Sequence, residues 1–158
     1  MNIYIATDHA GFELKEQLVQ YLEELGHDVV DMGASSLVDG DDYPDYILPC
    51  AKKVAESEGS LGIILGGSGQ GEAMVANKVP GIRASVFYGE AYPWLGDEEE
   101  GRGDGFQIVA LAREHNNANI LSLGARFISY PVAQEAVRVF LTTAFSEEAR
   151  HIRRLEKF

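Results

Sequence analysis

The alternation of short apolar runs with longer amphipathic segments constrains the fold more than any other feature of this sequence. The apolar runs have the length and the β-branched or aromatic residues typical of buried strands. They cover residues 3–6, 28–33, 61–67, 82–88 and 118–124. Because helical segments separate them, successive strands must join one sheet by parallel crossovers. The sequence therefore predicts an α/β fold, with a doubly wound five-stranded parallel sheet covered by helices on both faces.

The predicted helices carry their own start and stop signals. In the first of them an apolar stripe faces the core, and Gly26 is a typical residue to end the helix. The stripe consists of Leu14, Leu18, Leu22 and Leu25. Further helices are expected over residues 44–57, 71–77, 106–117 and 131–145. A C-terminal helix is expected over residues 146–158, with Ser146 as its N-cap, acidic residues in its first turn and basic residues later.

Composition indicates one globular domain over residues 1–158, with 46% hydrophobic and 24% charged residues. The net charge of −12 argues against nucleic acid or an anionic membrane as a partner. A single cysteine, Cys50, provides neither a disulfide framework nor a cysteine-based metal site, and it indicates a reducing, cytoplasmic setting. The first residues lack the features of a signal peptide, and no apolar run reaches the length of a membrane span.

Polar residues follow three of the predicted strands, and in sheets of this kind ligands bind beyond the carboxyl ends of the strands. Asp8 and His9 follow the first strand, Ser68 and Glu72 follow the third, and Arg126 follows the fifth. Since these strands are parallel, their carboxyl ends meet at one edge of the sheet. The sequence therefore predicts a ligand site at that edge.

A glycine-rich turn, "GGSGQGEAMVANK" (66–78), enters the helix after the third strand. The backbone N–H groups of such turns hold anions. The glycines of a dinucleotide-binding fingerprint would follow the first strand, but "TDHAG" there has one glycine, so dinucleotide binding is not expected. Asp31, after the second strand, is only a weak match to the acid that binds the ribose in that fingerprint. A P-loop is absent, since no G-K-[ST] follows the turn. The turn thus predicts an anion site next to a carboxylate, Glu72.

Each of these features also has a purely structural interpretation. Asp8 can cap a simple turn, and the glycines can serve only a tight turn. Glu72 can be a first-turn acid that interacts favourably with the helix dipole, and His115 can be a histidine at a helix end. Arg150 and Arg154 share one helix face, which can be a solvated face, although four of the 13 basic residues lie in the last nine positions.

Five segments of the chain together resemble the type B ribose-5-phosphate isomerase family, which also contains galactose-6-phosphate isomerases. They are "ATDHAGFELK", "DYPDY", "GGSGQGEAMVANKVPGIRA", "AREHNNANILSLGAR" and "RHIRRLEKF". The resemblance covers nearly the whole chain outside residues 89–105. It implies a Rossmann-like three-layer αβα sandwich and a cofactor-free, metal-free aldose–ketose isomerase of pentose phosphate metabolism. It also implies a homodimer or a dimer of dimers whose active sites are shared between two subunits.

The same resemblance implies two catalytic residues. The family has two branches, one with a cysteine as catalytic base just before the glycine turn and one with a glutamate just after it. Here Gly66 occupies the cysteine position, so Glu72 is the implied base for the proton that moves between C1 and C2 of the sugar. The backbone N–H groups of the turn are expected to stabilise the enediolate that this transfer creates. His115 matches the histidine that helps to open the furanose ring.

The remaining matched residues are implied to bind substrate. Their set is Asp8, His9, Tyr43, Gly67, Ser68, Gly69, Gln70, Gly71, Asn116, Arg126, Arg150 and Arg154. Within it Asp8 and His9 contact the sugar, with His9 at its phosphate end. The three arginines bind the phosphate, whose oxygens suit guanidinium groups.

Residues 89–105, which are acidic and glycine-rich, are an expected insertion relative to shorter family members. The insertion is either a solvated loop or a functional element, namely a lid over the site or an interface element, with Tyr92 and Trp94 as anchors. It leaves the substrate open among ribose 5-phosphate, galactose 6-phosphate, allose 6-phosphate and erythrulose phosphate. A non-catalytic sugar-phosphate-binding domain is a further alternative, but such a domain has no need of Glu72 and His115 together.

Overall fold

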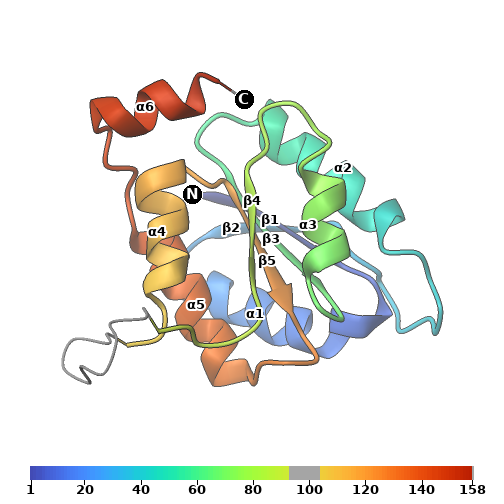
Figure 1. Ribbon diagram of the computed structural model, residues 1–158. Helices are drawn as coiled ribbons and strands as arrows, with labels where there is room; N and C mark the ends of the chain where they lie inside the picture. Colours follow the sequence, from blue (N-terminus) through green and yellow to red (C-terminus); the bar gives the residue numbers. More distant parts are fainter. Residues whose placement is uncertain (93–103, 158) are drawn as a thin grey trace.

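The computed structural model of the protein describes residues 1–92 and 104–157 (Figure 1). Residues 93–103, which form most of the predicted insertion and include Trp94, lie outside this description. Within the described residues the strands are β1 (Asn2–Thr7), β2 (Asp28–Asp31), β3 (Leu61–Gly66), β4 (Ala84–Phe87) and β5 (Ile120–Gly124). They form one parallel sheet in the order β2-β1-β3-β5-β4. The predicted fold class is confirmed, and each strand overlaps its predicted range.

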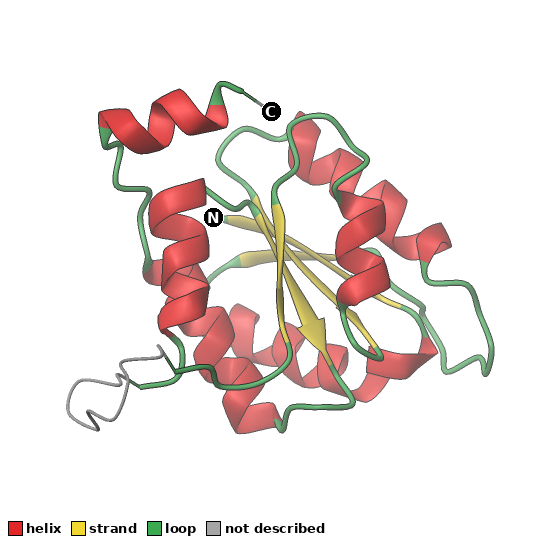
Figure 2. Cartoon of the chain, viewed as in Figure 1, coloured by secondary structure: helices red, strands yellow, loops and turns green. Residues whose placement is uncertain are grey.

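The helices cover both faces of this sheet, which gives three layers (Figure 2). Helix α1 (Phe12–Glu24), α4 (Gln107–Asn116) and α5 (Tyr130–Thr142) pack on one face, in a cluster that includes Leu18 and Leu22. Helix α2 (Pro44–Glu56) and α3 (Gln70–Ala76) pack on the other face. Of the predicted leucine stripe, Leu25 is exposed, because it is the C-cap of α1 and the chain turns away at Gly26, where φ is +79°.

Strand register places the chain segments that follow β1, β3 and β5 side by side. Thr7 pairs with Leu65, and Gly66 pairs with Gly124. The chain after β1 forms a 3₁₀ turn, η1 (His9–Gly11), before it enters α1. The carboxyl edge of the sheet therefore gathers the polar residues that the sequence places after these strands.

The last helix differs from its prediction. Helix α6 spans Ala149–Leu155, with Glu148 rather than Ser146 as its N-cap, and it lies beyond α4, apart from the two helical layers (Figure 1). The prediction of a helix from 146 was wrong because the chain between α5 and α6 is held by tertiary contacts. Ser146 donates its backbone N–H to Glu114, and Glu147 adopts a positive φ of 55°, which breaks helical geometry.

Candidate active site

A cavity of about 470 Å³ lies at the carboxyl edge of the sheet. Eight of the predicted site residues line it: Asp8, His9, Tyr43, Gly67, Ser68, Gly71, Glu72 and Arg126. Gly69 and Gln70 belong to the same glycine turn, where Gly69 caps α3 and Gln70 is its first residue. The structure thus brings together ten of the fourteen predicted residues in one chain, as the parallel sheet requires.

Glu72 lies in the first turn of α3, and only 5% of its surface is exposed. Burial raises the pKa of its carboxyl above the ordinary value, an effect that the charge of Asp8 reinforces and its own backbone N–H opposes. A carboxylate with a raised pKa is a stronger base than one in water. The environment of Glu72 therefore suits proton abstraction better than the dipole interaction that was its structural alternative.

Gly66, the last residue of β3, leaves the space that the Glu72 carboxylate fills. A Cβ atom at position 66 would lie 1.8 Å from Oε1 of Glu72 and 2.0 Å from its Cδ. A side chain at position 66 and the observed position of Glu72 therefore exclude each other. A cysteine side chain at position 66 and a glutamate side chain at position 72 distinguish the two branches of the resembled family. In this structure the two side chains would occupy the same space.

The glycine turn is held rigidly between β3 and β5. Gly69 has a left-handed φ of +74°, and a Cβ atom there would lie 2.9 Å from the carbonyl carbon of Leu123. Ser122, a buried residue of β5, donates its hydroxyl to the carbonyl oxygen of Gly69 at 2.6 Å. Because the first N–H groups of a helix have no partner within it, this fixed turn presents donors beside Glu72. Ser122 was missed from the sequence, where it is one residue of an apolar strand.

Asp8 and His9 occupy the turn after β1. Asp8 accepts a hydrogen bond from the backbone of Ala10 at 2.9 Å, so the structural interpretation as a cap holds for it, and it also lines the cavity. His9 is bound by a residue that sequence reasoning missed, Asp41. The Oδ1 atom of Asp41 lies 2.9 Å from the backbone nitrogen of His9 and 2.7 Å from its Nδ1. Asp41 stands among other acids in a loop, and no sequence signal selects it.

The pair shifts the titration of both side chains. The hydrogen bond that the His9 ring donates to Asp41 raises the pKa of His9; burial opposes the shift, and the charge of Asp8 reinforces it. Burial alone would raise the pKa of Asp41, but the hydrogen bonds from His9 and Tyr46, together with the charge of His9, hold that pKa below its usual value. His9 is therefore protonated over a wider pH range than a free histidine, as a ligand for an anion should be.

Asp8, His9 and Asp41 are also the group of potential metal ligands in the described residues, with ligand atoms within 4.8 Å of one another. Oδ1 of Asp41 already accepts two hydrogen bonds from His9. These hydrogen bonds explain the arrangement, because they orient the His9 ring. The absence of a metal from the site stays a prediction.

Arg126 and Tyr43 flank the glycine turn. The guanidinium carbon of Arg126 lies 3.4 Å from the point where Gly67 would carry a Cβ atom, and the Tyr43 hydroxyl oxygen lies 2.8 Å from the equivalent point at Gly71. The backbone of Arg126 is tied to the turn through Gly67 at 3.2 Å. Next to Arg126, Phe127 is 66% exposed on the cavity wall, and it was missed from the sequence.

Four predicted residues lie elsewhere: His115, Asn116, Arg150 and Arg154. Helix α4 runs antiparallel to the strands, so its last residues lie at the amino edge of the sheet, beside Asn117 and Met1. Strands of five or six residues span about 16–20 Å. The four residues are therefore separated from Glu72, within one chain, by roughly the depth of the sheet.

These four residues lie in a second cluster on α4 and α6, with packing contacts of its own. The His115 ring stacks on His151, with centroids 4.3 Å apart, and His151 is buried with its Nδ1 2.8 Å from the Ser146 hydroxyl. Burial lowers the pKa of His151, and His115 lowers it further. Arg150 is exposed and pairs with Glu148 at 2.7 Å. None of the four residues lines the cavity that contains Glu72 in the same chain.

A doubly wound sheet whose carboxyl edge holds a buried carboxylate, an N–H turn and an arginine defines an α/β enzyme with an acid–base site. The sequence profile of the Ribose/Galactose Isomerase family matches residues 3–93 and 105–158. The chain belongs to this family, and the resemblance noted in the sequence is confirmed. The profile leaves residues 94–104 unmatched.

Relatives of known name agree with this assignment. The chain is 39% identical over 156 residues to ribose-5-phosphate isomerase B of Mycobacterium tuberculosis, covering 99% of this chain and 86% of the relative. A crystal structure of ribose-5-phosphate isomerase B from Mycoplasma genitalium, with bound ribulose-5-phosphate, matches with a TM-score of 0.85 at 36% identity, covering 99% and 92% of the two chains. The enzyme of Thermotoga maritima matches with a TM-score of 0.83 at 39% identity, covering 99% and 95%. Among the described residues, no helix is both long and apolar enough to cross a bilayer.

Proposed function

We propose that this protein is a cofactor-free aldose–ketose isomerase that interconverts ribose 5-phosphate and ribulose 5-phosphate through an enediolate. The observation that carries the proposal is the buried Glu72 carboxylate, held in the gap at Gly66 beside the N–H groups of the glycine turn. This arrangement places a base and an anion hole on one carbon–oxygen unit of a bound sugar. The related enzyme with ribulose-5-phosphate bound shares the fold over nearly its full length.

The reaction begins with ring opening, which is assigned to His115. Glu72 then takes the proton from C2 of the open-chain aldose, while the turn stabilises the negative charge on oxygen. The protonated Glu72 returns that proton to C1, and a hydroxyl proton passes from O2 to O1, which completes the ketose. The raised pKa of Glu72 favours its uptake of the proton from C2.

The phosphate group is assigned to the cationic groups around the cavity. His9 is kept protonated by Asp41 at one side, and Arg126 lies over the glycine turn at the other. Arg150 and Arg154, the remaining predicted phosphate ligands, are exposed on α6 at the opposite edge of the sheet. They and His115 are available to the cavity of a second copy.

A homodimer, or a dimer of dimers, with shared active sites accounts for the division of the fourteen residues. In a two-fold pair, the end of α4 and the helix α6 of one copy reach the carboxyl edge of the other. Each site then combines Glu72 of one copy with His115 of its partner. A cytoplasmic location is part of the proposal, and the one cysteine of the chain, Cys50, is a free and buried thiol, as suits a reducing compartment. A role in the pentose phosphate pathway follows from the proposed substrates, which are both pentose phosphates.

Activity on pure sugar phosphates tests the proposal. Purified protein is assayed with ribose 5-phosphate, allose 6-phosphate, galactose 6-phosphate and erythrulose phosphate in parallel. The highest kcat/KM is expected with ribose 5-phosphate. A preference for a six-carbon or four-carbon substrate would move the assignment within the isomerases, and binding without turnover of any of the four would favour a non-catalytic domain.

A further inference from the structure

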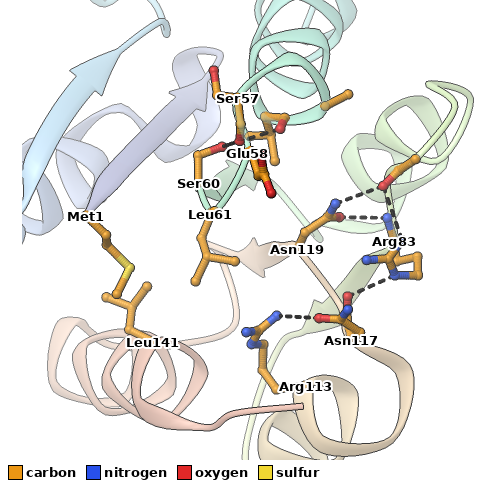
Figure 3. A pocket seen from close by; sticks show the side chains of 14 residues that line it. Met1, Ser57, Glu58, Ser60, Leu61, Arg83, Arg113, Asn117, Asn119 and Leu141 are labelled. Carbon is orange, nitrogen blue, oxygen red and sulfur yellow. Dashed lines mark hydrogen bonds between the residues drawn. The ribbon is translucent and has the colours of Figure 1, made fainter. Parts of the chain in front are cut away.

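A second cavity, of about 420 Å³, lies at the amino edge of the sheet, at the opposite end of the strands from Glu72. Figure 3 shows Arg83 and Arg113 among the residues that line it, with Asn117 between them, Asn119 beside Arg83, and Ser57, Glu58 and Ser60 on the other side. Arg83 precedes β4 and Arg113 belongs to α4. None of these residues belongs to the predicted active site.

The two guanidinium groups are held in place by main-chain oxygens. Nε of Arg83 donates to the carbonyl oxygens of Asn116 and Asn117, at 3.2 and 2.8 Å. Nε of Arg113 donates to the carbonyl oxygen of Thr143 at 3.2 Å. Their Nη1 atoms also bond to protein oxygens. In the part of the chain that the structure describes, the Nη2 atom of neither arginine has a hydrogen-bond partner.

The charges of this pair lack compensation. Among the described residues, no carboxylate lies within 4.0 Å of either guanidinium, and the Glu58 carboxylate on the lining is exposed. Burial lowers the pKa of both side chains, and the charge of Arg83 lowers the pKa of Arg113 further. Half-buried like charges are unfavourable unless an opposite charge joins them. This uncompensated positive charge stands in a chain of net charge −12, in which acidic residues outnumber basic ones 25 to 13.

We propose that this cavity binds a small oxyanion, a phosphate or carboxylate group held by the free Nη2 atoms of Arg83 and Arg113. Guanidinium groups match the oxygens of both anions. The cavity has the size of small-ligand pockets, so its occupant is a metabolite and not a macromolecule. The site is distinct from the isomerase site and does not depend on the proposed function.

The test follows the arginine side chains directly, by the ¹⁵N–¹H signals of their Nε groups in solution. The protein carries Arg126→Ala, Arg150→Ala and Arg154→Ala, which remove the three arginines predicted to bind phosphate in the active site. Inorganic phosphate is titrated at constant ionic strength, with citrate as the carboxylate probe and sodium chloride as the reference. The signals of Arg83 and Arg113 are expected to shift together and to saturate with phosphate or citrate, and the stronger probe identifies the anion class.

Two further variants fix the location. Glu58→Gln removes the exposed acid on the lining and is expected to tighten binding by about twofold. Arg113→Lys keeps the charge but loses the paired N–H donors of the guanidinium group. It is expected to weaken binding without loss of fold. Shifts that stay linear, or that chloride reproduces, would overturn the proposal, as would saturable shifts confined to other arginines.

Discussion

At the scale of single residues, the pairing of Gly66 with Glu72 sets the chemistry. Glu72→Gln keeps the size of the side chain but cannot take a proton, so kcat is expected to fall by about 10²–10⁴ while KM changes little. Solvent deuterium exchange into C1 of ribulose 5-phosphate should disappear with it. A folded variant that still exchanges would assign the proton transfer to another group.

The same variant is expected to gain stability at neutral pH. The folded pKa of Glu72 is raised, so between the ordinary carboxyl pKa of 4.5 and the folded value the native state holds the proton that the unfolded chain has lost. Stability therefore falls as pH rises through this window. The Tm of Glu72→Gln should exceed that of the parent protein at pH of about 8. The two Tm values should agree at pH of about 4.

Gly66→Ala tests the exclusion between position 66 and the carboxylate. A methyl group there would lie 1.8 Å from Oε1, so Glu72 must move and kcat is expected to fall by about tenfold or more, since displaced catalytic groups lose rate steeply. Gly67→Ala is the matched control, because its Cβ would meet Arg126 no closer than 3.4 Å. Equal kcat losses in the two variants would count against the geometric explanation.

Asp41→Asn tests the histidine that Asp41 holds. Without the carboxylate the pKa of His9 should drop back toward 6.5, so the ring is neutral over more of the range above that value. KM for ribose 5-phosphate is expected to rise severalfold near pH 8 and much less near pH 6, where the ring stays protonated. Asp39→Asn is the control, since the charge of Asp39 is the smallest of the named effects on the pKa of His9. A pH-independent rise in KM would reduce Asp41 to a structural role.

At the scale of elements, the described ends of the predicted insertion meet. The backbone N–H of Ala91 donates to the carbonyl oxygen of Gly105 at 2.9 Å, and Tyr92 bonds to Glu90 at 2.7 Å. Because these ends are already closed, deletion of residues 93–103 with a short glycine linker is expected to leave thermal stability nearly unchanged. If the segment is a lid, KM rises; if it is a solvated loop, KM and kcat stay within about twofold. Circular dichroism confirms the fold before the kinetics are compared.

At the scale of the whole molecule, the separation of His115 from Glu72 predicts complementation between inactive subunits. Glu72→Gln and His115→Ala proteins are refolded together in equal amounts, so half of the dimers are hybrids with one intact site. About a quarter of the wild-type activity is expected to return, since a shared site in a two-fold dimer draws on both chains.

A second mixture is the control for this experiment. Glu72→Gln and Arg126→Ala lie in the same cavity of one chain, so no hybrid of the two has an intact site. No recovery in the first mixture would show that the site is completed within one chain, and recovery in the second would show that Glu72 and Arg126 of one site come from different chains.

The fold class could be predicted from the sequence, because strand and helix periodicity are local and the crossovers between them leave only a parallel sheet. The sequence also determined the carboxyl-edge site, since every loop that follows a parallel strand ends there: Asp8, His9, Glu72 and Arg126 needed no further information. It fixed Gly26 as a helix end, where the signal lies in one residue. These inferences depend on neighbours along the chain.

Tertiary structure alone decided what depends on distant contacts. Asp41 is one of several acids in its loop, and only packing against η1 selects it for His9. Ser146 failed as an N-cap because contacts to Glu114 and His151 hold it outside the helix. The overlap of Gly66 with the Glu72 carboxylate, and the placement of His115 across the sheet, are distances between residues that no local pattern encodes. The residue types of the site could therefore be predicted from the sequence. The division of the site between two edges of the sheet could not, because helix direction and chain packing determine that division.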